Sequence, residues 1–288
     1  MIPEYPDLEP LNIAHRAELQ PSFKKIMCGI SEFTFANLFL FRHTHNYSLT
    51  KVPDNQIIVT GSDSGDEFFM LPFGSPDDEM LLALFARFGT LKAACEELSK
   101  ELLEKGFLVT EDRDNFDYLY LTEDLRDLAG RRYHKKRNLV KLFNANYTAK
   151  IEELTIDKID DARTVLDSWL AERNPEAGDG DYAAALEALN NMAAINLKGA
   201  IYYIEGKPVA YTTGEIMPQM STFVTHFEKG LNKYKGLLQF VNRDFASRLP
   251  EGCKFINREQ DLGDAGLRQA KESYRPFGFV RKYRVRPK

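Results

Sequence analysis

The order of predicted helices and strands repeats once along the chain, and this repeat constrains the fold more than any other feature of the sequence. A similar order of elements returns after about residue 150, although few residues are identical between the halves. The 288 residues exceed the usual size of one domain, and a hydrophobic content of 43% can fill two ordinary cores. We therefore expect an α/β protein (α+β, with mixed sheets) made of two domains in tandem, residues 1–148 and residues 149–288.

Segments with β-branched or aromatic alternation indicate a strand meander in the first half. The turn residues Pro53-Asp54-Asn55 and Ser62-Asp63-Ser64-Gly65 separate these segments, as expected for antiparallel strands. The predicted strands span residues 47–52, 56–61, 67–72, 107–110 and 117–121, and the predicted helices span residues 13–27, 80–88 and 90–105, with another helix opening at residue 122. The first half is therefore expected to form a small sheet with helices around it.

The second half predicts a hairpin followed by alternating helices and strands. Glu205-Gly206 supplies the turn between strands over residues 200–204 and 207–216. Further strands are predicted over residues 151–154, 221–228, 255–257 and 279–285, and helices over residues 155–172, 182–191, 236–249 and 266–274. Residues 221 to 285 thus form a strand, helix, strand, helix, strand unit.

Charge and cysteine content exclude several classes of protein. A formal net charge of −5 argues against a protein that coats nucleic acid over a whole face, although it allows a local basic patch. Cys28, Cys95 and Cys253 are odd in number and far apart, which fits neither a disulfide framework nor a zinc site. The histidine pair His43-x-His45 has no cysteine or acidic companion nearby, so we predict no metal site.

Neither a targeting segment nor a membrane span is expected. The N-terminal residues are acidic and rich in proline, unlike a signal peptide. The most apolar stretch, Phe33 to Phe41, contains Thr34 and Asn37 and is about half as long as the roughly 20 residues that a membrane-spanning helix requires. These features, with the unpaired cysteines, favour a cytoplasmic protein in a reducing compartment.

The sharpest local motif is Ala270-x-x-x-Tyr274-x-x-x-Gly278-Phe279, a helix end followed by a turn into a strand. It resembles the last helix and strand of the GNAT acyltransferase superfamily, whose helix tyrosine often protonates a departing thiolate. The resemblance implies that Tyr274 acts as a general acid, because a phenol can give its proton to an anion that it already hydrogen-bonds. The alternative is a structural tyrosine whose ring packs in a core while its hydroxyl reaches solvent.

A second GNAT resemblance lies upstream, at Lys233-Tyr-Lys235-Gly236-Leu-Leu238. In GNAT domains the corresponding loop and helix N-terminus hold a cofactor pyrophosphate, with Gln or Arg, two residues, Gly, one residue, then Gly or Ala. The resemblance implies that Lys235 and Gly236 bind phosphate, but the bulky Leu238 would crowd a diphosphate that needs close backbone approach. The alternative is an ordinary solvated turn before a helix.

A closer resemblance covers most of the chain. The motifs Asn257-Arg-Glu-Gln-Asp-Leu-Gly263, Gly266-Leu-Arg268, Lys271, Ser273-Tyr274 and Gly130-Arg-Arg-Tyr-His-Lys-Lys-Arg-Asn138 are similar to a bacterial family grouped with the C-terminal domain of phosphatidylglycerol lysyltransferases. That family has a tandem GNAT fold related to the Fem-type aminoacyltransferases. The resemblance implies that the basic residues Arg268 and Lys271 meet an anionic substrate, whereas without it they would be read as a solvated helix face.

Polar residues follow directly after the predicted strand over residues 255–257, a position where α/β folds commonly place working groups. Glu259 or Asp261 could accept a proton from an attacking amine or hydroxyl, and Arg258 could bind phosphate. In the structural alternative, Asp261 caps the following helix and Arg258 pairs with Glu259.

The densest basic run interleaves Tyr133 and His134 with Arg131, Arg132, Lys135, Lys136 and Arg137. Basic residues among aromatic ones can bind phosphates and stack bases, which makes these five residues candidates for binding the acceptor end of a tRNA. The alternative is a solvated helix between domains.

Together these features predict acyl transfer, with aminoacyl-tRNA as the donor and an unidentified acceptor. Since the chain shows no membrane segment, the acceptor would be soluble or the protein would visit a membrane surface transiently. Two other functions stay open: a coenzyme A-dependent N-acyltransferase that uses acyl-CoA, and a catalytically silent binding module that kept the fold.

Overall fold

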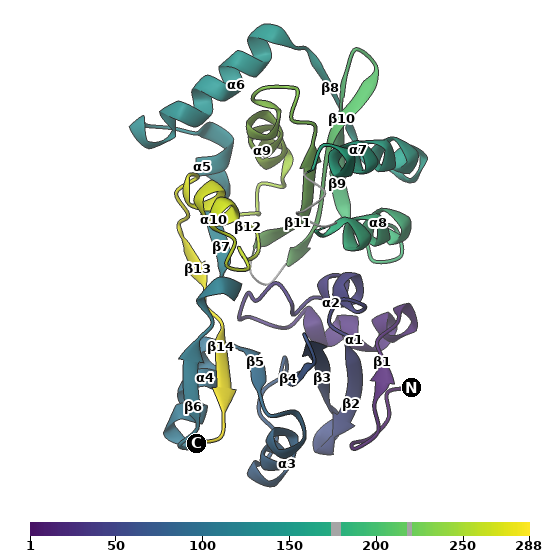
Figure 1. Ribbon diagram of the computed structural model, residues 1–288, viewed down its shortest axis with the longest axis vertical. Helices are drawn as coiled ribbons and strands as arrows, with labels where there is room; N and C mark the ends of the chain where they lie inside the picture. The colour runs from purple at the N-terminus through teal and green to yellow at the C-terminus, as the bar shows by residue number, and fades with distance from the viewer. Residues whose placement is uncertain (174–179, 218–220) are drawn as a thin grey trace. The chain divides into compact units, whose positions relative to one another are not determined.

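The computed structural model describes residues 1–173, 180–217 and 221–288. They form two compact units, each a mixture of helices and strands (Figure 1). The first unit comprises residues 1–117, 260–265 and 279–288, and the second comprises residues 118–259 and 266–278. The predicted α/β class is confirmed, since two mixed sheets of seven strands are present in the described ranges.

The first sheet has the strand order β1-β2-β3-β4-β5-β14-β6. Strands β2, β3 and β4 pair antiparallel, which confirms the predicted meander. The bounds are β1 (Glu9–Pro10), β2 (Ser48–Val52), β3 (Gln56–Asp63), β4 (Asp66–Met70), β5 (Leu91–Ala94), β6 (Leu108–Glu111) and β14 (Tyr283–Arg286). Strand β5 pairs parallel to β4, and β14 pairs antiparallel to both β5 and β6.

The helices of the first unit supply its apolar core. They are α1 (Arg16–Phe23), α2 (Phe35–Phe41), α3 (Asp78–Phe88) and α4 (Glu96–Glu104), with 3-10 turns η1 (Ile13–His15), η2 (Pro53–Asn55) and η3 (Arg113–Asn115). Asp77 caps α3 by accepting from the Met80 amide at 2.8 Å, and Phe85 of this helix meets Phe69 of β4 at 5.0 Å between ring centroids. The capping and the apolar spacing together fix α3 against the sheet.

The helix predicted over residues 90–105 is wrong in its first third. Residues 91–94 form β5, and the helix begins only at Glu96. Leucine, lysine and alanine favour a helix locally, but Leu91 and Ala94 are buried in the same core as Val285 of β14. Pairing between neighbouring strands therefore overrides the local preference.

A buried lysine ties the C-terminal residues into the first unit. The Lys282 side chain is 1% exposed, and its Nζ donates to Asp117 Oδ1 at 2.7 Å and also to Glu32. The carboxylate of Asp117 further accepts the amide and hydroxyl of Ser31, each at 2.9 Å. Because both carboxylates and the ammonium have partners, the burial of these charges is tolerated.

The second sheet has the strand order β13-β7-β12-β11-β10-β9-β8. Lys207 pairs with Ile204 across Glu205-Gly206, which confirms the predicted hairpin. The bounds are β7 (Asp117–Leu121), β8 (Ala149–Glu153), β9 (Lys198–Ile204), β10 (Lys207–Met217), β11 (Thr222–Gly230), β12 (Phe255–Asn257) and β13 (Gly278–Val280). Strands β9, β10 and β11 run antiparallel, whereas β12 is parallel to β11.

The helices of the second unit cover both faces of its sheet (Figure 1). They are α5 (Thr122–Asp127), α6 (His134–Asn146), α7 (Ile159–Ala171), α8 (Tyr182–Asn191), α9 (Leu237–Arg248) and α10 (Ala265–Glu272), with 3-10 turns η4 (Arg131–Tyr133) and η5 (Ile156–Lys158). Phe223 of β11 faces α9, where its ring lies 5.1 Å from that of Phe245. Lys229 of the same strand contacts Trp169 of α7 on the other face, because a β-bulge between Phe223 and Lys229 adds one residue and reverses the alternation of side chains.

The compact units are cut at different residues from the predicted domains. The expected boundary after residue 148 lies within the second unit. Helix α6 packs on α9, with the rings of Phe143 and Phe240 stacked at 4.6 Å. Phe143 is fully buried in the core that also contains Val241, so residues 118–148 contribute to the second core.

The closing strand predicted over residues 279–285 is in fact two strands. Gly278–Val280 is β13 of the second sheet, and Tyr283–Arg286 is β14 of the first sheet. The break falls at Arg281-Lys282, where the Lys282 ammonium bonds to Asp117. Only the first part of the final strand in the expected strand, helix, strand, helix, strand unit, β13, therefore belongs to the second sheet.

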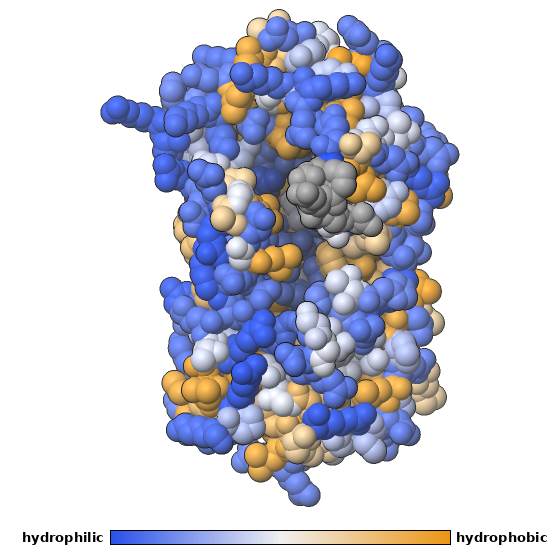
Figure 2. All heavy atoms as spheres, in the orientation of Figure 1, coloured by the Kyte–Doolittle hydropathy of each residue, from blue (hydrophilic) through white to orange (hydrophobic). Residues whose placement is uncertain are grey.

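The surface drawn in Figure 2 is mainly hydrophilic, and hydrophobic residues on it form small separate groups. Exposed large hydrophobic residues such as Ile156 and Leu262 are far apart in the sequence. Across the described ranges, the helices are all too short or too polar to span a bilayer.

We predict that Lys282→Met destabilises the protein by about 3–5 kcal/mol, because it leaves two buried carboxylates without their cation. The measurement is the free energy of unfolding from urea denaturation. Arg281→Met is the matched control, since Arg281 is 55% exposed, and it should change stability by less than about 0.5 kcal/mol. Equal effects of the two substitutions would show that the buried ion pair is not required.

Candidate active site

Tyr274 is buried at the start of the turn that follows α10. Its side chain packs in a cluster with Tyr118, Tyr120 and Ile256. Tyr120 of β7 also donates its hydroxyl proton to the Lys271 carbonyl at 2.8 Å, which anchors the end of α10 next to the sheet. The sheet and the helix end together fix the position of the Tyr274 ring.

Two basic side chains lie against the Tyr274 ring. The Nζ of Lys136, on α6, is 3.9 Å from the ring centroid, and the guanidinium carbon of Arg258, after β12, is 5.4 Å from it. Arg258 donates to Glu228 Oε1 at 2.9 Å, so it does not form the pair with Glu259 that the structural alternative expected. Residues from three separate elements thus meet at one aromatic ring.

The site shifts the pKa values of both Tyr274 and Lys136. Burial raises the pKa of Tyr274 well above its ordinary range, while Arg258 and a hydrogen bond with Gln239 oppose the rise. Burial, with the nearby Arg258 charge, lowers the pKa of Lys136 to about 8. At neutral pH the phenol keeps its proton, whereas the amine of Lys136 is partly neutral.

His226 occupies an irregular position in β11. The register passes from Thr213–Phe227 to Gly214–Thr225, so His226 is the extra residue of a β-bulge. Its buried ring bonds to Glu259 Oε1 at 2.8 Å through Nδ1 and to Glu215 Oε1 at 3.2 Å through Nε2. Burial alone would lower the pKa of His226, but the two carboxylates outweigh it and raise the pKa to about 10.

Glu259 and Lys271 shape the loop after β12. Glu259 has a left-handed backbone (φ 54°), and its amide donates to Asn257 Oδ1 at 2.8 Å. The Nζ of Lys271 donates to the carbonyls of Arg258 at 2.6 Å and of Glu259 at 3.0 Å. Lys271, expected to hold an anion, therefore fixes the loop that carries Arg258 and Glu259.

Gly236 is the N-cap residue just before α9, and its φ of 90° is a conformation that only glycine adopts easily. A Cβ atom at this position would lie 2.3 Å from the carbonyl oxygen of Leu139 on α6. The Leu238 side chain lies beside Gly230 of β11, where a Cβ on that glycine would be 2.9 Å from it. The space next to Gly236 is therefore occupied by the backbone of α6, and the Leu238 side chain points to Gly230 instead. Lys235, before Gly236, is exposed.

The basic run is divided among several roles. Arg132 donates to Asp124 at 2.6 Å and Arg137 to the carbonyl of Gly130 at 2.6 Å, so both make structural contacts. Lys136 faces Tyr274, whereas Arg131 and Lys135 are exposed.

Asp261 belongs to the first unit, whereas Tyr274 belongs to the second. It is fully buried, where Oδ1 accepts the Gly263 amide at 2.9 Å and Oδ2 lies 3.3 Å from Arg113 Nη1. These contacts fix the turn before α10. The role resembles the structural alternative, in which Asp261 caps the following helix. Arg268 lies on α10 and is half-buried.

The structure adds Glu215, His226, Glu228 and Gln239 to the predicted site residues. For Glu215, His226 and Glu228 the available signal was the placement of ionisable residues inside strands that otherwise read as buried, whereas Gln239 lies on α9. Their partners come from distant segments, so the pairings themselves carried no local signal.

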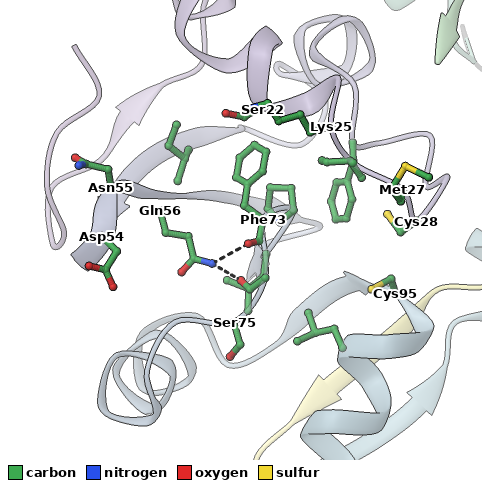
Figure 3. Close-up of a pocket in the computed structure, with 17 residues that line it drawn as sticks. Ser22, Lys25, Met27, Cys28, Asp54, Asn55, Gln56, Phe73, Ser75 and Cys95 are labelled. Atoms are coloured by element: carbon green, nitrogen blue, oxygen red, sulfur yellow. Dashed lines mark hydrogen bonds between the residues drawn. The ribbon is translucent and has the colours of Figure 1, made fainter. Parts of the chain in front are cut away.

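A cavity of about 740 Å³ lies in the first unit, and none of the predicted site residues lines it (Figure 3). Cys28 and Cys95 are both at its edge, with Phe33, Leu71 and Phe73 among the apolar residues around them. Burial raises the pKa of the Cys28 thiol to about 12, so this thiol stays protonated at neutral pH and is a poor nucleophile.

The described residues contain no group of three or more His, Cys, Asp and Glu side chains arranged to hold a metal ion. The side chains gathered at Tyr274 are a buried phenol, a half-buried amine and a paired guanidinium.

The fold defined by these two units is that of tandem GNAT proteins. A GNAT-family acetyltransferase from Colwellia psychrerythraea has a TM-score of 0.54 at 10% identity, covering 98% of this chain and 100% of that one. FemX has a TM-score of 0.57 at 8% identity, with 96% of each chain covered. At these identities the likeness concerns the fold alone.

The chain belongs to the family described as phosphatidylglycerol lysyltransferase, C-terminal, whose model matches residues 23–286. The structure of L-PGS from Bacillus licheniformis has a TM-score of 0.62 at 15% identity and covers 100% of this chain and 94% of that one. The resemblance found in the sequence is thereby confirmed.

Two further relatives have no function in their descriptions. A conserved protein of unknown function from Bacteroides thetaiotaomicron is 29% identical, with a TM-score of 0.88 and 100% of both chains covered. An uncharacterised protein of Mycoplasmoides gallisepticum is 24% identical over 187 residues, which are 62% of this chain. The match spans only 58% of that curated relative.

We predict that the stability advantage conferred by His226 falls as pH rises. The pKa of His226 is about 10 in the folded protein and about 6.5 when unfolded, so its ionic bonds stabilise fully below pH 6.5 and are lost toward pH 10. Urea unfolding of the wild type and of His226→Gln at pH 6, 8 and 10 measures this. A difference in unfolding free energy that does not shrink with pH would contradict the assignment.

We also predict that Gly236→Ala destabilises the protein by more than about 1 kcal/mol, since the new Cβ meets the Leu139 carbonyl and the backbone is left-handed. Gly252→Ala is the control, because nothing lies within 4 Å of a Cβ there, and we expect a change below about 0.5 kcal/mol. Thermal unfolding of both variants tests the packing of α6 on α9. Similar melting temperatures would contradict it.

Proposed function

We propose that this protein transfers an aminoacyl group from an aminoacyl-tRNA to an acceptor amine or hydroxyl, at the site around Tyr274 in the second unit. The observation that carries the proposal is the buried Tyr274 phenol with two basic side chains against its ring. Membership of the phosphatidylglycerol lysyltransferase C-terminal family supports the same class of chemistry.

In this proposal the acceptor attacks the carbonyl carbon of the aminoacyl ester, and the bond to the ribose oxygen breaks. Tyr274 gives its phenolic proton to that departing oxygen. Its raised pKa suits an alkoxide, because an alkoxide is more basic than a thiolate and needs a proton as it leaves. The phenol also remains protonated, and so ready to donate, throughout the neutral pH range.

Arg258 has the supporting role of placing positive charge next to the phenol. Its pairing with Glu228 and the bonds from Lys271 to the carbonyls of Arg258 and Glu259 hold this loop in one geometry. Glu259, proposed from the sequence as a proton acceptor, lies against the cationic ring of His226. We therefore assign Glu259 to positioning and not to proton transfer.

The packing at Gly236 argues against the alternative of a coenzyme A-dependent N-acyltransferase. A pyrophosphate would need close approach to the backbone at the start of α9. The carbonyl oxygen of Leu139 already lies against Gly236, and an oxygen with partial negative charge repels phosphate. Lys235 and Gly236 are then structural in this proposal.

Only part of the basic run over residues 131–137 is proposed to bind tRNA. Arg131 and Lys135 are exposed and available for phosphate, whereas Arg132 and Arg137 already have partners. The acceptor stays unassigned, and a soluble molecule or a lipid headgroup reached at a membrane surface both fit. A catalytically silent binding module remains the rival, and activity separates the two.

We predict that the protein releases amino acid from charged tRNA into a product when given anionic lipid vesicles or peptides, and that Tyr274→Phe lowers the rate about 10²- to 10⁴-fold without unfolding it. The measurement uses tRNA charged with radiolabelled amino acids, with circular dichroism to check folding. No product with any amino acid or acceptor would contradict the proposed transfer. Binding of acetyl-CoA in calorimetry would instead favour the coenzyme A alternative.

A further inference from the structure

Lys136 differs from the other basic residues of the second unit that are shielded from water. His226, Lys229 and Arg258 each bond to a carboxylate, and Lys271 bonds to two carbonyls. Lys136 is half-buried over the Tyr274 ring, and none of the carboxylates in the described ranges is within ion-pair distance of it.

The groups around Lys136 favour loss of its proton. Tyr274, which follows α10, presents its ring, and Arg258, which follows β12, presents a permanent positive charge. Two carboxylates of the second unit already have cationic partners. Glu228 of β11 accepts from Arg258, and Asp124 of α5 accepts from Arg132, which precedes α6. Burial and the Arg258 charge both disfavour the ammonium of Lys136, so its amine is about half neutral near pH 8.

We propose that Lys136 is the group that takes the proton from the attacking amine or hydroxyl of the acceptor. This inference rests on the proposed function and completes its proton balance. As the acceptor forms its bond to the carbonyl carbon, its proton passes to the Lys136 amine. The ribose oxygen leaves with the proton of Tyr274, and transfer of one proton from Lys136 to Tyr274 restores both groups.

The geometry separates this role from that of a phosphate clamp. A clamp gains from an ammonium that stays charged and can reach a phosphate, and Lys135 is an exposed lysine of the same basic run. Lys136 instead lies over the ring whose hydroxyl is the proposed acid, which places acid and base side by side. Because arginine keeps its charge but cannot act as a base, it distinguishes the two roles.

The first test needs no activity. Reductive methylation followed by peptide mass spectrometry gives the pH dependence of labelling at single lysines. We expect half-maximal labelling of Lys136 near pH 8, well below the value of about 10.4 for a lysine side chain in water, and the exposed Lys141 on the same helix is the comparison. The same pH dependence at both lysines would overturn the inference.

The second test compares transfer by Lys136→Arg, Lys136→Gln and the control Lys141→Gln. We expect both Lys136 variants to lose about 10²- to 10⁴-fold in rate and to lose the rise in rate near pH 8, while Lys141→Gln keeps both. Added methylamine should restore part of the rate to Lys136→Ala, which a purely structural role would not allow. Circular dichroism and unfolding midpoints confirm that each variant is folded.

The outcomes separate this inference from the proposed function. Full activity of Lys136→Arg with the wild-type pH profile would show that only the charge matters, and would overturn the inference while the transfer stands. No transfer by the wild type with any charged tRNA or acceptor would overturn both.

Discussion

The packing of α6 on α9 is the contact on which the second unit depends. Phe143 stacks on Phe240, and the Leu139 carbonyl rests on Gly236, so the two helices meet with almost no space between their backbones at that glycine. One turn earlier on α6, Lys136 is held over Tyr274 as a result. A single helix contact therefore fills the place where a pyrophosphate would bind and brings a lysine to the proposed acid.

The buried basic groups around this site differ in how firmly their neighbours fix their protonation. His226, between two carboxylates in a β-bulge, is held as a cation, and Arg258 is neutralised by Glu228. The Lys271 ammonium donates its hydrogen bonds to the backbone carbonyls of Arg258 and Glu259. These fully bonded groups make the loop after β12 rigid, and Lys136 is left as the titratable group whose protonation the surroundings do not fix.

The sequence predicted what local patterns encode. The meander, the hairpin at Glu205-Gly206 and the tyrosine after α10 are all present, because turn residues and alternation act within a few positions. Residues 91–94 were assigned to a helix, since their strand is decided by partners far along the chain. Lys136 was assigned to a tRNA patch for the same reason: its contact with Tyr274 joins residues that only tertiary packing brings together.

Strand β14 lies between β5 and β6 in the first sheet. In the chain, the second unit separates β14 from both of these strands. During synthesis on a ribosome, β5 and β6 emerge long before residues 283–286 exist. Until residues 283–286 are made, β5 and β6 lack the strand that pairs with both of them. Their backbone N–H and C=O groups facing that position are then unpaired, and a chaperone could shield them. The unit that begins first in translation is completed last.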